Sequence, residues 1–278
     1  MKIGILCAIP KEIHFFELLP NSGQRVGGRT FFKSKHPFHE LIIVECGIGK
    51  VNSAMVSTIL IQQFKCEILI FSGIAGGIDP DMKIGEVLIG EFLIQYDYGS
   101  LKDGNIQVYR AGEIPMGLQK NKAEFVIDPQ IKEIINTALP DVRMGTILTG
   151  DVFLQCQETR KELYEKFGAQ AVEMEGGAIA QVAEQFGIPA IVVRCLSDLA
   201  GANGHNLSST SLKKAAKNSF ETVQSILNAL LYFFLLYTSD PSYYTPFFFF
   251  LFPLFFSFFF SFFFLFPFLF FFFLSPSP

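Results

Sequence analysis

The sequence lacks the features that mark several large classes of protein. It has no run of basic residues and a net charge of −4, so it offers no electrostatic footprint for nucleic acid. Its four histidines and five cysteines are scattered, without CxxC or CxxH spacing, and zinc sites are usually built on such spacings. We therefore expect no metal, no cofactor and no nucleic-acid partner, and a small molecule as the partner.

The first 230 residues also lack a recognisable leader or membrane anchor. The segment MKIGILCAIPKE at the start of the chain runs into a strand-like stretch and breaks at Pro10, unlike a signal peptide. Cys7, Cys46 and Cys195 lie in or beside apolar runs, as buried free thiols do. An odd, scattered set of cysteines suits a reducing compartment. We expect a cytoplasmic protein.

The composition changes sharply near the end of the chain. Most of the 34 phenylalanines lie beyond residue 230, and residues 247–274 are almost entirely Phe and Leu. Such a stretch is long and apolar enough to span a bilayer, but no lysine or arginine follows Lys217 to set its orientation. LLYTSD resembles a translated sequencing adapter, and poly-Phe is encoded by a pyrimidine repeat. We interpret residues 233–278 as a read-through or assembly artefact, with a membrane anchor as the alternative.

Residues 1–232 are expected to form one domain in which strands alternate with helices. Apolar runs predict strands at 2–9, 41–46, 67–73, 85–94, 145–149 and 189–196, and helical patterns occupy 50–64, 129–138, 158–167, 176–186 and 210–231. Several strands are apolar throughout, as strands covered on both faces are. The pattern predicts an α/β fold, a three-layer α/β/α sandwich with a central mixed, largely parallel sheet. The polar, Gly-rich segment 95–128 is expected to be a long functional loop or an interface element.

Carboxylates gather at the predicted strand ends, which is where chemistry collects in such folds. They are Glu12, Asp151, Glu173, Glu175 and Asp198, with Arg194 inside the strand that leads to Asp198. An isolated ionised carboxylate costs free energy to bury. Several of them aimed at one end of a sheet indicate acid–base chemistry on a neutral, hydroxyl-rich ligand.

Two features at these strand ends have a plain structural explanation when taken alone. The acids in AVEMEGGAIA (171–180) stand where a helix begins, and the helix dipole stabilises such acids by about 0.3–1 kcal/mol. The clusters GIGK and GIAGG lack the spacing of a P-loop or a dinucleotide-binding turn. They are expected to make tight turns or to let the backbone approach a ligand closely.

Six ordered segments resemble those of the bacterial 5′-methylthioadenosine/S-adenosylhomocysteine nucleosidases, which belong to the purine nucleoside phosphorylase superfamily. These segments are MKIGILCAIPKE, CGIGKVNSA, SGIAGGI, TGDVFL, AVEMEGGAIA and VVRCLSDLA. The resemblance covers about residues 1–230. It implies a nucleoside phosphorylase-like fold and hydrolysis of the N-glycosidic bond of both nucleosides, which releases adenine in methionine salvage and the methyl cycle.

The resemblance assigns the catalytic pair to Glu12 and Asp198. Glu12 falls on the acid that activates water, and Asp198 falls on the proton donor, which Ser197 orients. Arg194 lies close to the nucleophile pocket. These roles suit the chemistry, because adenine leaves easily only when it is protonated and water is a weak nucleophile that needs a base. Carboxylates also stabilise an oxocarbenium-like sugar.

The resemblance also assigns the substrate contacts. Met174 and Glu175 fall on the ribose-binding pair, with Glu173 beside them as a supporting residue. Phe153 falls on the aromatic residue that stacks on adenine, and Leu154 on the backbone contact to the base. Polarisable and apolar side chains of this kind bind sugar and base faces.

The remaining expected contacts come from the glycine-containing segments, and some positions depart from the family. Ile48 matches an apolar residue near the alkylthio group, and Gly76 is expected to contact the substrate. Ile74 stands where some relatives carry Ser near the water site. NLSSTSL (206–212) replaces a Phe-containing segment over the sugar, and the 97–116 loop also differs. These departures affect the preferred 5′-substituent more than the bond that is cleaved.

Three alternatives stay open at this point. A purine nucleoside phosphorylase would need cationic donors around phosphate, which an acid at Glu12 would repel. A hydrolase of a related adenine nucleoside, such as aminodeoxyfutalosine, is chemically closer. A nucleoside-binding protein without activity would not need both a base and an acid. Family analogy further predicts a homodimer, whose interface includes the 97–116 loop and the helix after Lys50.

Overall fold

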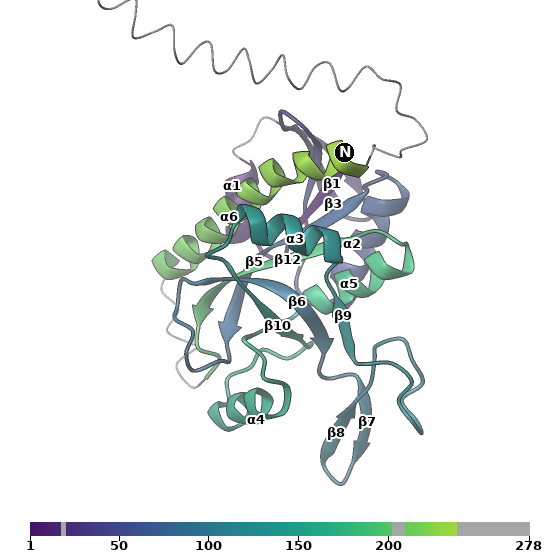
Figure 1. Ribbon diagram of the computed structural model, residues 1–278, viewed down its shortest axis with the longest axis vertical. Coiled ribbons are helices and arrows are strands. Elements are labelled where there is room, and N and C mark those ends of the chain that lie inside the picture. The colour runs from purple at the N-terminus through teal and green to yellow at the C-terminus, as the bar shows by residue number, and fades with distance from the viewer. Residues whose placement is uncertain (18–20, 202–208, 238–278) are drawn as a thin grey trace, which may run out of the picture. The chain divides into compact units, whose positions relative to one another are not determined.

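The computed structural model describes residues 1–17, 21–201 and 209–237 (Figure 1). Contacts divide the chain into Met1–Phe233 and Phe234–Pro278, and the description below concerns the first unit. Residues 238–278, which make up most of the proposed artefact or anchor, lie outside the described part, so both hypotheses stay predictions. Among the described residues, no helix combines the length and the apolar character needed to cross a membrane.

One mixed sheet forms the centre of the unit. Its order is β11–β10–β6–β12–β5–β1–β4–β3–β2, with β9 paired to β6. The bounds are β1 Lys2–Cys7, β2 Asn21–Val26, β3 Arg29–Lys35, β4 Glu40–Glu45, β5 Ile68–Gly77, β6 Val87–Gln95, β9 Glu124–Val126, β10 Arg143–Thr149, β11 Ala171–Glu173 and β12 Ala190–Asp198. Strands β4, β1, β5 and β12 run parallel to one another, so their carboxyl ends share one edge.

The sheet closes on itself at one side. Strand β11 pairs with β10 and also with β5, so β11, β10, β6, β12 and β5 form a ring. This closure brings Val172 of β11 opposite Gly76 of β5. The open part of the sheet continues from β5 through β1 to β2.

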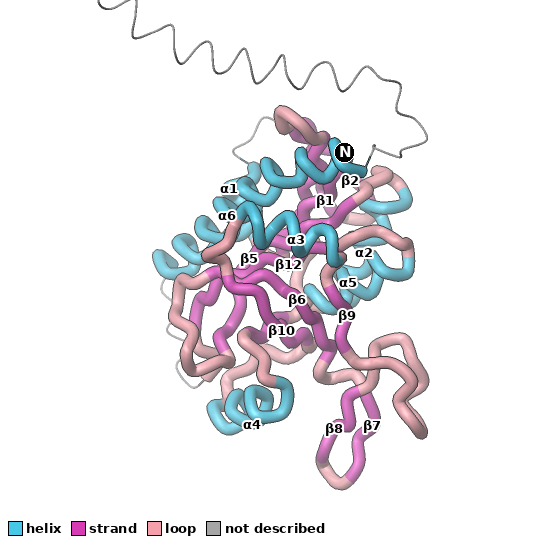
Figure 2. The backbone as a smooth tube through the Cα atoms, viewed as in Figure 1, coloured by secondary structure: helices cyan, strands magenta, loops and turns pink. Residues whose placement is uncertain are grey.

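Helices cover both faces of the sheet, as expected for a three-layer α/β/α sandwich (Figures 1 and 2). Helices α1, α3 and α6 pack on one face, and α2 and α5 pack on the other. Their bounds are α1 Pro10–Glu17, α2 Lys50–Gln62, α3 Pro129–Ala138, α5 Gly176–Gln185 and α6 Ser209–Tyr237. Helix α4, Gln157–Phe167, covers a smaller apolar cluster near the β7–β8 hairpin.

The two-sided covering explains the unbroken apolar runs. In β1, Ile3 and Ile5 pack toward α1, α3 and α6, whereas Leu6 packs toward α2 and α5. All three side chains are fully buried. Burial of each such side chain contributes about 1.5–3 kcal/mol, so both faces favour apolar residues.

The structure corrects one sequence-based expectation. The segment 95–128 is not a plain loop, since it contains the hairpin β7 (Gly99–Lys102) and β8 (Asn105–Val108) and the strand β9. The hairpin side chains are mostly exposed, so no apolar alternation marks it. The signal present was Asp103-Gly104, where both residues have positive φ, as a two-residue hairpin turn requires.

Candidate active site

The catalytic and substrate-contact residues that the resemblance assigns meet around one pocket, with the exception of Arg194. Glu12, Ile48, Ile74, Gly76, Phe153, Leu154, Glu173, Met174, Glu175, Ser197 and Asp198 all line it, and Arg194 does not. The lining also includes Ala8, Ile9, Ala75, Val152, Val172 and Ala200. Sequence reasoning missed these six because small and apolar side chains carry no chemical signal of their own.

Glu12 reaches the pocket from the first turn of α1. Pro10 begins that helix, and the Glu12 carboxylate bends back so that Oε2 accepts hydrogen bonds from Ala8 N (2.7 Å) and Ile9 N (3.1 Å). Its Oε1 accepts from Ile74 N at 2.9 Å. A Glu at this helical position commonly caps its own helix, and here the same side chain is fixed at the pocket wall. Burial raises its pKa, against the lowering effect of Arg194 and these three N–H groups.

Arg194 lies beneath the pocket and is completely buried. Its Nη2 lies 2.5 Å from Glu173 Oε2 and 3.2 Å from Glu175 Oε2, and its Nη1 lies 3.8 Å from Glu12 Oε1. The guanidinium stacks on the Phe71 ring, with Cζ 3.6 Å from the ring centroid, a cation–π contact. One cation therefore serves three buried carboxylates.

Glycine at position 73 makes room for this cluster. A Cβ atom on Gly73 would collide with both Arg194 Nη1 and Glu12 Oε1. The sequence predicts that this glycine segment makes a tight turn or lets the backbone approach a ligand closely. In the structure, Gly73 lets the backbone of β5 pass close to side chains of the protein itself. The close neighbours at Gly73 are the charged side chains.

Glu173 and Glu175 differ in how they are held. Both Glu173 oxygens are occupied by protein donors, which include Thr149 Oγ1 (2.5 Å), Gly176 N (2.8 and 2.9 Å) and Glu175 N (3.0 Å). Glu175 has fewer partners, namely Gly49 N at 2.7 Å and Arg194. Glu175 thus keeps acceptor capacity for a ligand, whereas Glu173 holds the cluster together.

The cluster holds three carboxyl groups and one guanidinium. Desolvation by burial and the neighbouring Glu173 charge raise the pKa of Glu175, because Arg194 is shared. The pKa of Glu12 is raised as well. The pocket floor is therefore a buried site that would gain from a positive charge in its ligand.

Asp198 lies at the end of β12, at a break in strand register beside Gly76. Its Oδ2 accepts from Ser197 Oγ at 2.8 Å, and its Oδ1 accepts from Ala200 N at 2.8 Å. Its side chain is mostly buried, yet it lines the pocket. Ser197 therefore fixes one carboxylate oxygen, as a proton donor requires for a defined orientation.

The opposite wall is apolar and open. Phe153 and Val152 are 55% and 59% exposed, and Ile48 is 53% exposed. An exposed aromatic face beside carboxylates suits a flat heterocycle. Leu154 is buried beneath this wall in a small apolar cluster near α4.

Asp151 departs from the expectation that all five strand-end acids meet. It does not line the pocket, and its Oδ1 accepts from Lys50 N at the start of α2. Among the described residues, no cluster of His, Cys, Asp and Glu has an arrangement that could hold a metal ion.

Comparisons with known proteins agree on one family. The sequence model of the phosphorylase superfamily matches residues 2–231. A 5′-methylthioadenosine/S-adenosylhomocysteine nucleosidase of Mycobacterium tuberculosis (strain CDC 1551 / Oshkosh) is 35% identical over 221 residues, which cover 72% of this chain and 87% of that protein.

Two solved structures share the fold. The S-adenosylhomocysteine nucleosidase of Streptococcus pyogenes, in complex with 5-methylthiotubericidin, is 32% identical with a TM-score of 0.74, covering 83% of this chain and 97% of that one. The futalosine hydrolase of Helicobacter pylori strain 26695 is 30% identical with a TM-score of 0.74, covering 82% and 97%.

Proposed function

Because the chain belongs to the phosphorylase superfamily and, within it, to the 5′-methylthioadenosine/S-adenosylhomocysteine nucleosidases, we propose that it hydrolyses the N-glycosidic bond of both nucleosides. The products are adenine and the corresponding thioribose. The enzyme is an N-glycosyl hydrolase, and the steps below assign its residues.

The observation that carries this proposal is the gathering of three carboxyl groups around one guanidinium beneath the pocket. Glu12, Glu173 and Glu175 surround the single buried cation of Arg194. A ribosyl group that loses its base develops positive charge at C1′ and the ring oxygen. Carboxylates fixed at this position stabilise that positive charge in their ionised form, and a preorganised site of this kind lowers a barrier.

Bond cleavage uses Asp198 as the acid. Its proton passes to N7 of adenine as the electron pair of the C1′–N9 bond moves into the ring. Ser197 holds one Asp198 oxygen, so the other oxygen and its proton keep a fixed direction. The apolar side chain of Phe153 provides the stacking surface for the base, and Leu154 the backbone contact.

Water attack uses Glu12 as the base. The water oxygen bonds to C1′, and its proton passes to a Glu12 oxygen. Glu175 accepts hydrogen bonds from the ribose hydroxyls, and Met174 packs on the sugar. Glu173 positions Arg194 and Glu175, while Ile48 lies by the 5′-substituent and Ile74 and Gly76 border the water and base sites.

A second candidate substrate is favoured by one comparison. The futalosine hydrolase has the same TM-score as the nucleosidase, at similar identity. A hydrolase of a related adenine nucleoside, such as aminodeoxyfutalosine, would use the same acid, base and carboxylate floor. The two activities differ only in what the pocket mouth accepts at the 5′ position.

Adenine release measured on three nucleosides tests the proposal. The purified protein is given 5′-methylthioadenosine, S-adenosylhomocysteine or aminodeoxyfutalosine, each with and without phosphate. We expect rapid, phosphate-independent release from the first two. Release that requires phosphate would identify a phosphorylase, and tight binding without release would identify a nucleoside-binding protein.

The cellular setting and assembly follow from the same assignment. We place the enzyme in the cytoplasm, where it serves methionine salvage and the methyl cycle, and we propose a homodimer. Exposed apolar side chains on α2 and in the 97–116 segment support the dimer: Val51 is 81% exposed, Ile114 73% and Met116 75%. Large exposed apolar side chains of this kind are available to an interface with a second copy of the chain.

A further inference from the structure

Three charged residues outside the pocket form a closed ring of hydrogen bonds. Lys50 Nζ donates to Asp97 Oδ1 at 2.6 Å, Asp151 N donates to Asp97 Oδ2 at 2.9 Å, and Lys50 N donates to Asp151 Oδ1 at 2.9 Å. Lys50 and Asp97 are largely buried, with side chains 18% and 21% exposed. Both oxygens of Asp97 are therefore used, one on a cation and one on a backbone N–H group.

The ring replaces a helix cap that the local sequence does not supply. Helix α2 begins after Gly49, which has no side chain to cap it, so its first N–H groups need a partner from elsewhere. Asp151 provides that partner across 101 residues of sequence. Gly49 has a φ of 97°, which favours glycine, and a Cβ atom there would lie 3.1 Å from Asp151 Oδ1.

The ring is directly connected to both sides of the pocket. On one side, Gly49 N donates to Glu175 Oε1 at 2.7 Å. On the other side, Asp151 is followed by Val152, Phe153 and Leu154, which line the apolar wall. Lys50 is the first residue of α2, whereas Asp97 and Asp151 follow β6 and β10, which pair with each other, so the ring joins the start of α2 to two neighbouring strand ends.

We propose that Lys50 and Asp97 are positioning residues for glycoside hydrolysis. This inference rests on the proposed function. Asp97 holds Lys50 and the Asp151 backbone, Asp151 holds the start of α2, and the start of α2 holds the Gly49 N–H group against Glu175. The ring thereby fixes the distance between the carboxylate that binds ribose and the aromatic wall that binds the base.

Two substitutions break the ring without touching the pocket. Asp97→Asn keeps the volume but turns an amide NH₂ toward either the Lys50 ammonium or the Asp151 N–H group, where no acceptor remains. Lys50→Met keeps the backbone bond to Asp151 and removes the ammonium. Lys50→Arg retains the charge and serves as the conservative variant.

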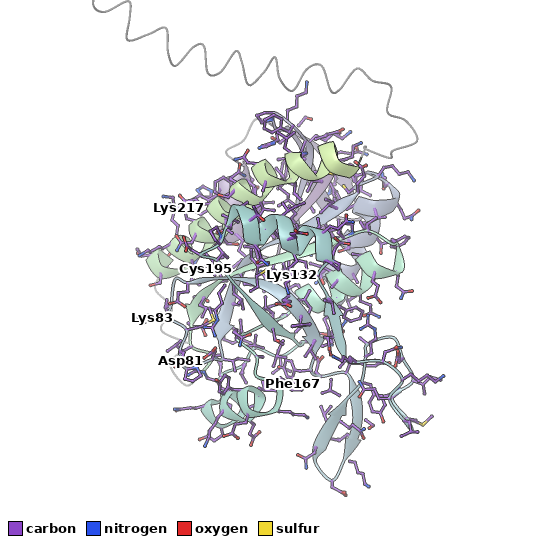
Figure 3. The ribbon with its side chains drawn as sticks, in the orientation of Figure 1. Asp81, Lys83, Lys132, Phe167, Cys195 and Lys217 are labelled. Atoms are coloured by element: carbon purple, nitrogen blue, oxygen red, sulfur yellow. The ribbon has the colours of Figure 1, made fainter. Side chains whose placement is uncertain are left out.

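Lys132 provides a matched control. Lys132, which is labelled in Figure 3, belongs to α3, and its Nζ lies 2.5 Å from Glu91 Oε1. The Lys132 side chain is 38% exposed and the Glu91 side chain 22%. Neither residue lines the pocket. Lys132→Met therefore removes a comparable, partly buried ion pair at a place unrelated to Glu175.

The kinetic test uses 5′-methylthioadenosine. We expect Asp97→Asn and Lys50→Met to lower kcat/KM at least ~10-fold, mainly through kcat because Glu175 acts most strongly in the transition state. Lys50→Arg and Lys132→Met should stay within ~3-fold of the parent. In a Glu175→Gln background, the Asp97→Asn effect should shrink below ~3-fold, since both act through one group. The proposal is overturned if Asp97→Asn and Lys50→Met keep the parental kcat/KM. It is also overturned if Asp97→Asn lowers kcat/KM as much in the Glu175→Gln background as in the parent.

A second measurement does not depend on activity, and its control segment shows that each variant is folded. Amide hydrogen exchange of the segment 46–52 reports on the Gly49 N–H group. We expect at least ~10-fold faster exchange there in Lys50→Met and Asp97→Asn, with the segment 72–78 unchanged. Unchanged exchange at Gly49 overturns the proposal even if the protein hydrolyses the substrate. If the parent does not release adenine, the proposed function fails, while exchange still decides whether the ring holds Gly49.

Discussion

Glu173, and not Glu175, holds the greater share of the Arg194 guanidinium, because Nη2 lies 2.5 Å from Glu173 and 3.2 Å from Glu175. Glu12 is farther still, at 3.8 Å from Nη1. Arg194 therefore pairs most closely with Glu173, the carboxylate whose oxygens also accept hydrogen bonds from other protein donors. Glu12 and Glu175, which also line the pocket, have raised pKa values.

The raised pKa of Glu12 predicts the pH dependence of kcat/KM. In the proposed mechanism Glu12 acts as a base only when it is deprotonated, so activity should be lost as the pH falls through its folded-state pKa. Because burial raises that pKa, the acid limb should lie above the ordinary glutamate value of about 4.3. A profile measured on 5′-methylthioadenosine between pH 4.5 and 8 checks this, using ~0.5-unit steps.

Glu175 also has a raised pKa, so its contribution must be separated. In Glu175→Gln, the remaining activity should keep the acid limb if Glu12 causes it. If the acid limb disappears in this variant, the titrating group that causes it is Glu175 and not Glu12. A flat profile down to pH 5 in the parent would contradict the assignment of Glu12, with a raised pKa, as the base.

Glu12→Gln should abolish hydrolysis and leave nucleoside binding nearly intact. The amide keeps the size of the side chain but cannot take a proton, and loss of a general base costs ~10²–10⁴-fold in rate. Single-turnover kinetics and calorimetric titration with 5′-methylthioadenosine measure the two effects. Wild-type turnover in this variant would remove Glu12 from the mechanism.

Asp198→Asn should lower the rate at least ~10²-fold with little change in Tm. The asparagine oxygen can still accept from Ala200 N, so a merely structural turn would survive the change. Asp79→Asn is the matched control, since Asp79 is buried and paired with Arg143 Nη2 at 2.8 Å outside the pocket. It should lower Tm and preserve the rate.

A leaving group that needs no protonation sharpens the test of Asp198. On a 4-nitrophenyl riboside analogue, the loss caused by Asp198→Asn should be much smaller than on 5′-methylthioadenosine. An equal loss on both substrates, or near wild-type cleavage of the nucleoside, would rule out Asp198 as the acid.

A chain that ends at residue 232 should fold and be active. Its last core side chains, Leu227 and Leu230, are fully buried against the sheet, and they are retained. A chain that ends at residue 222 is the control, because it also removes Val223 and Ile226 from the same core, and it should not fold. If the 232-residue chain is inactive while the full chain works, the artefact interpretation of the tail is wrong.

The enzyme should sediment as a dimer at micromolar concentration. Val51→Glu, on the exposed face of α2, should shift it toward monomer, because a charge at a buried apolar interface is costly. Ile84→Glu provides the control, since Ile84 is also exposed at 55% but precedes β6. A fully active monomeric parent would contradict the homodimer.

Much of the fold follows from the sequence because burial on both faces imposes apolar runs. The core strands and α2, α3, α4 and α5 begin and end within a few residues of their expected limits. Helix α1 is absent from the sequence-based prediction because it has only eight residues, begins at Pro10 and directly follows a predicted strand. Strand β5 extends to Gly77 because its glycine-rich end pairs with β11 and β12, a tertiary effect that no local pattern contains.

The candidate site was only partly accessible to the same reasoning. Residue types at strand ends were enough to collect the lining acids, but not to separate Asp151 from them, since its role is set by Lys50 in a distant segment. The closed ring of strands, which brings Val172 to Gly76, was also invisible. Pairings between distant segments depend on packing rather than on periodicity.

The buried charge cluster also sets a limit on how this enzyme can be improved. An acid whose pKa is raised by folding contributes stability only below its unfolded value of about 4.3, and that contribution is lost as the pH rises through the folded value. Near neutrality, Glu12 and Glu175 therefore weaken the fold they belong to. Selection of variants for heat resistance alone should enrich neutral side chains at these two positions. The most heat-resistant variants should therefore be inactive. Selection for heat stability of this protein must therefore be combined with selection for catalytic turnover.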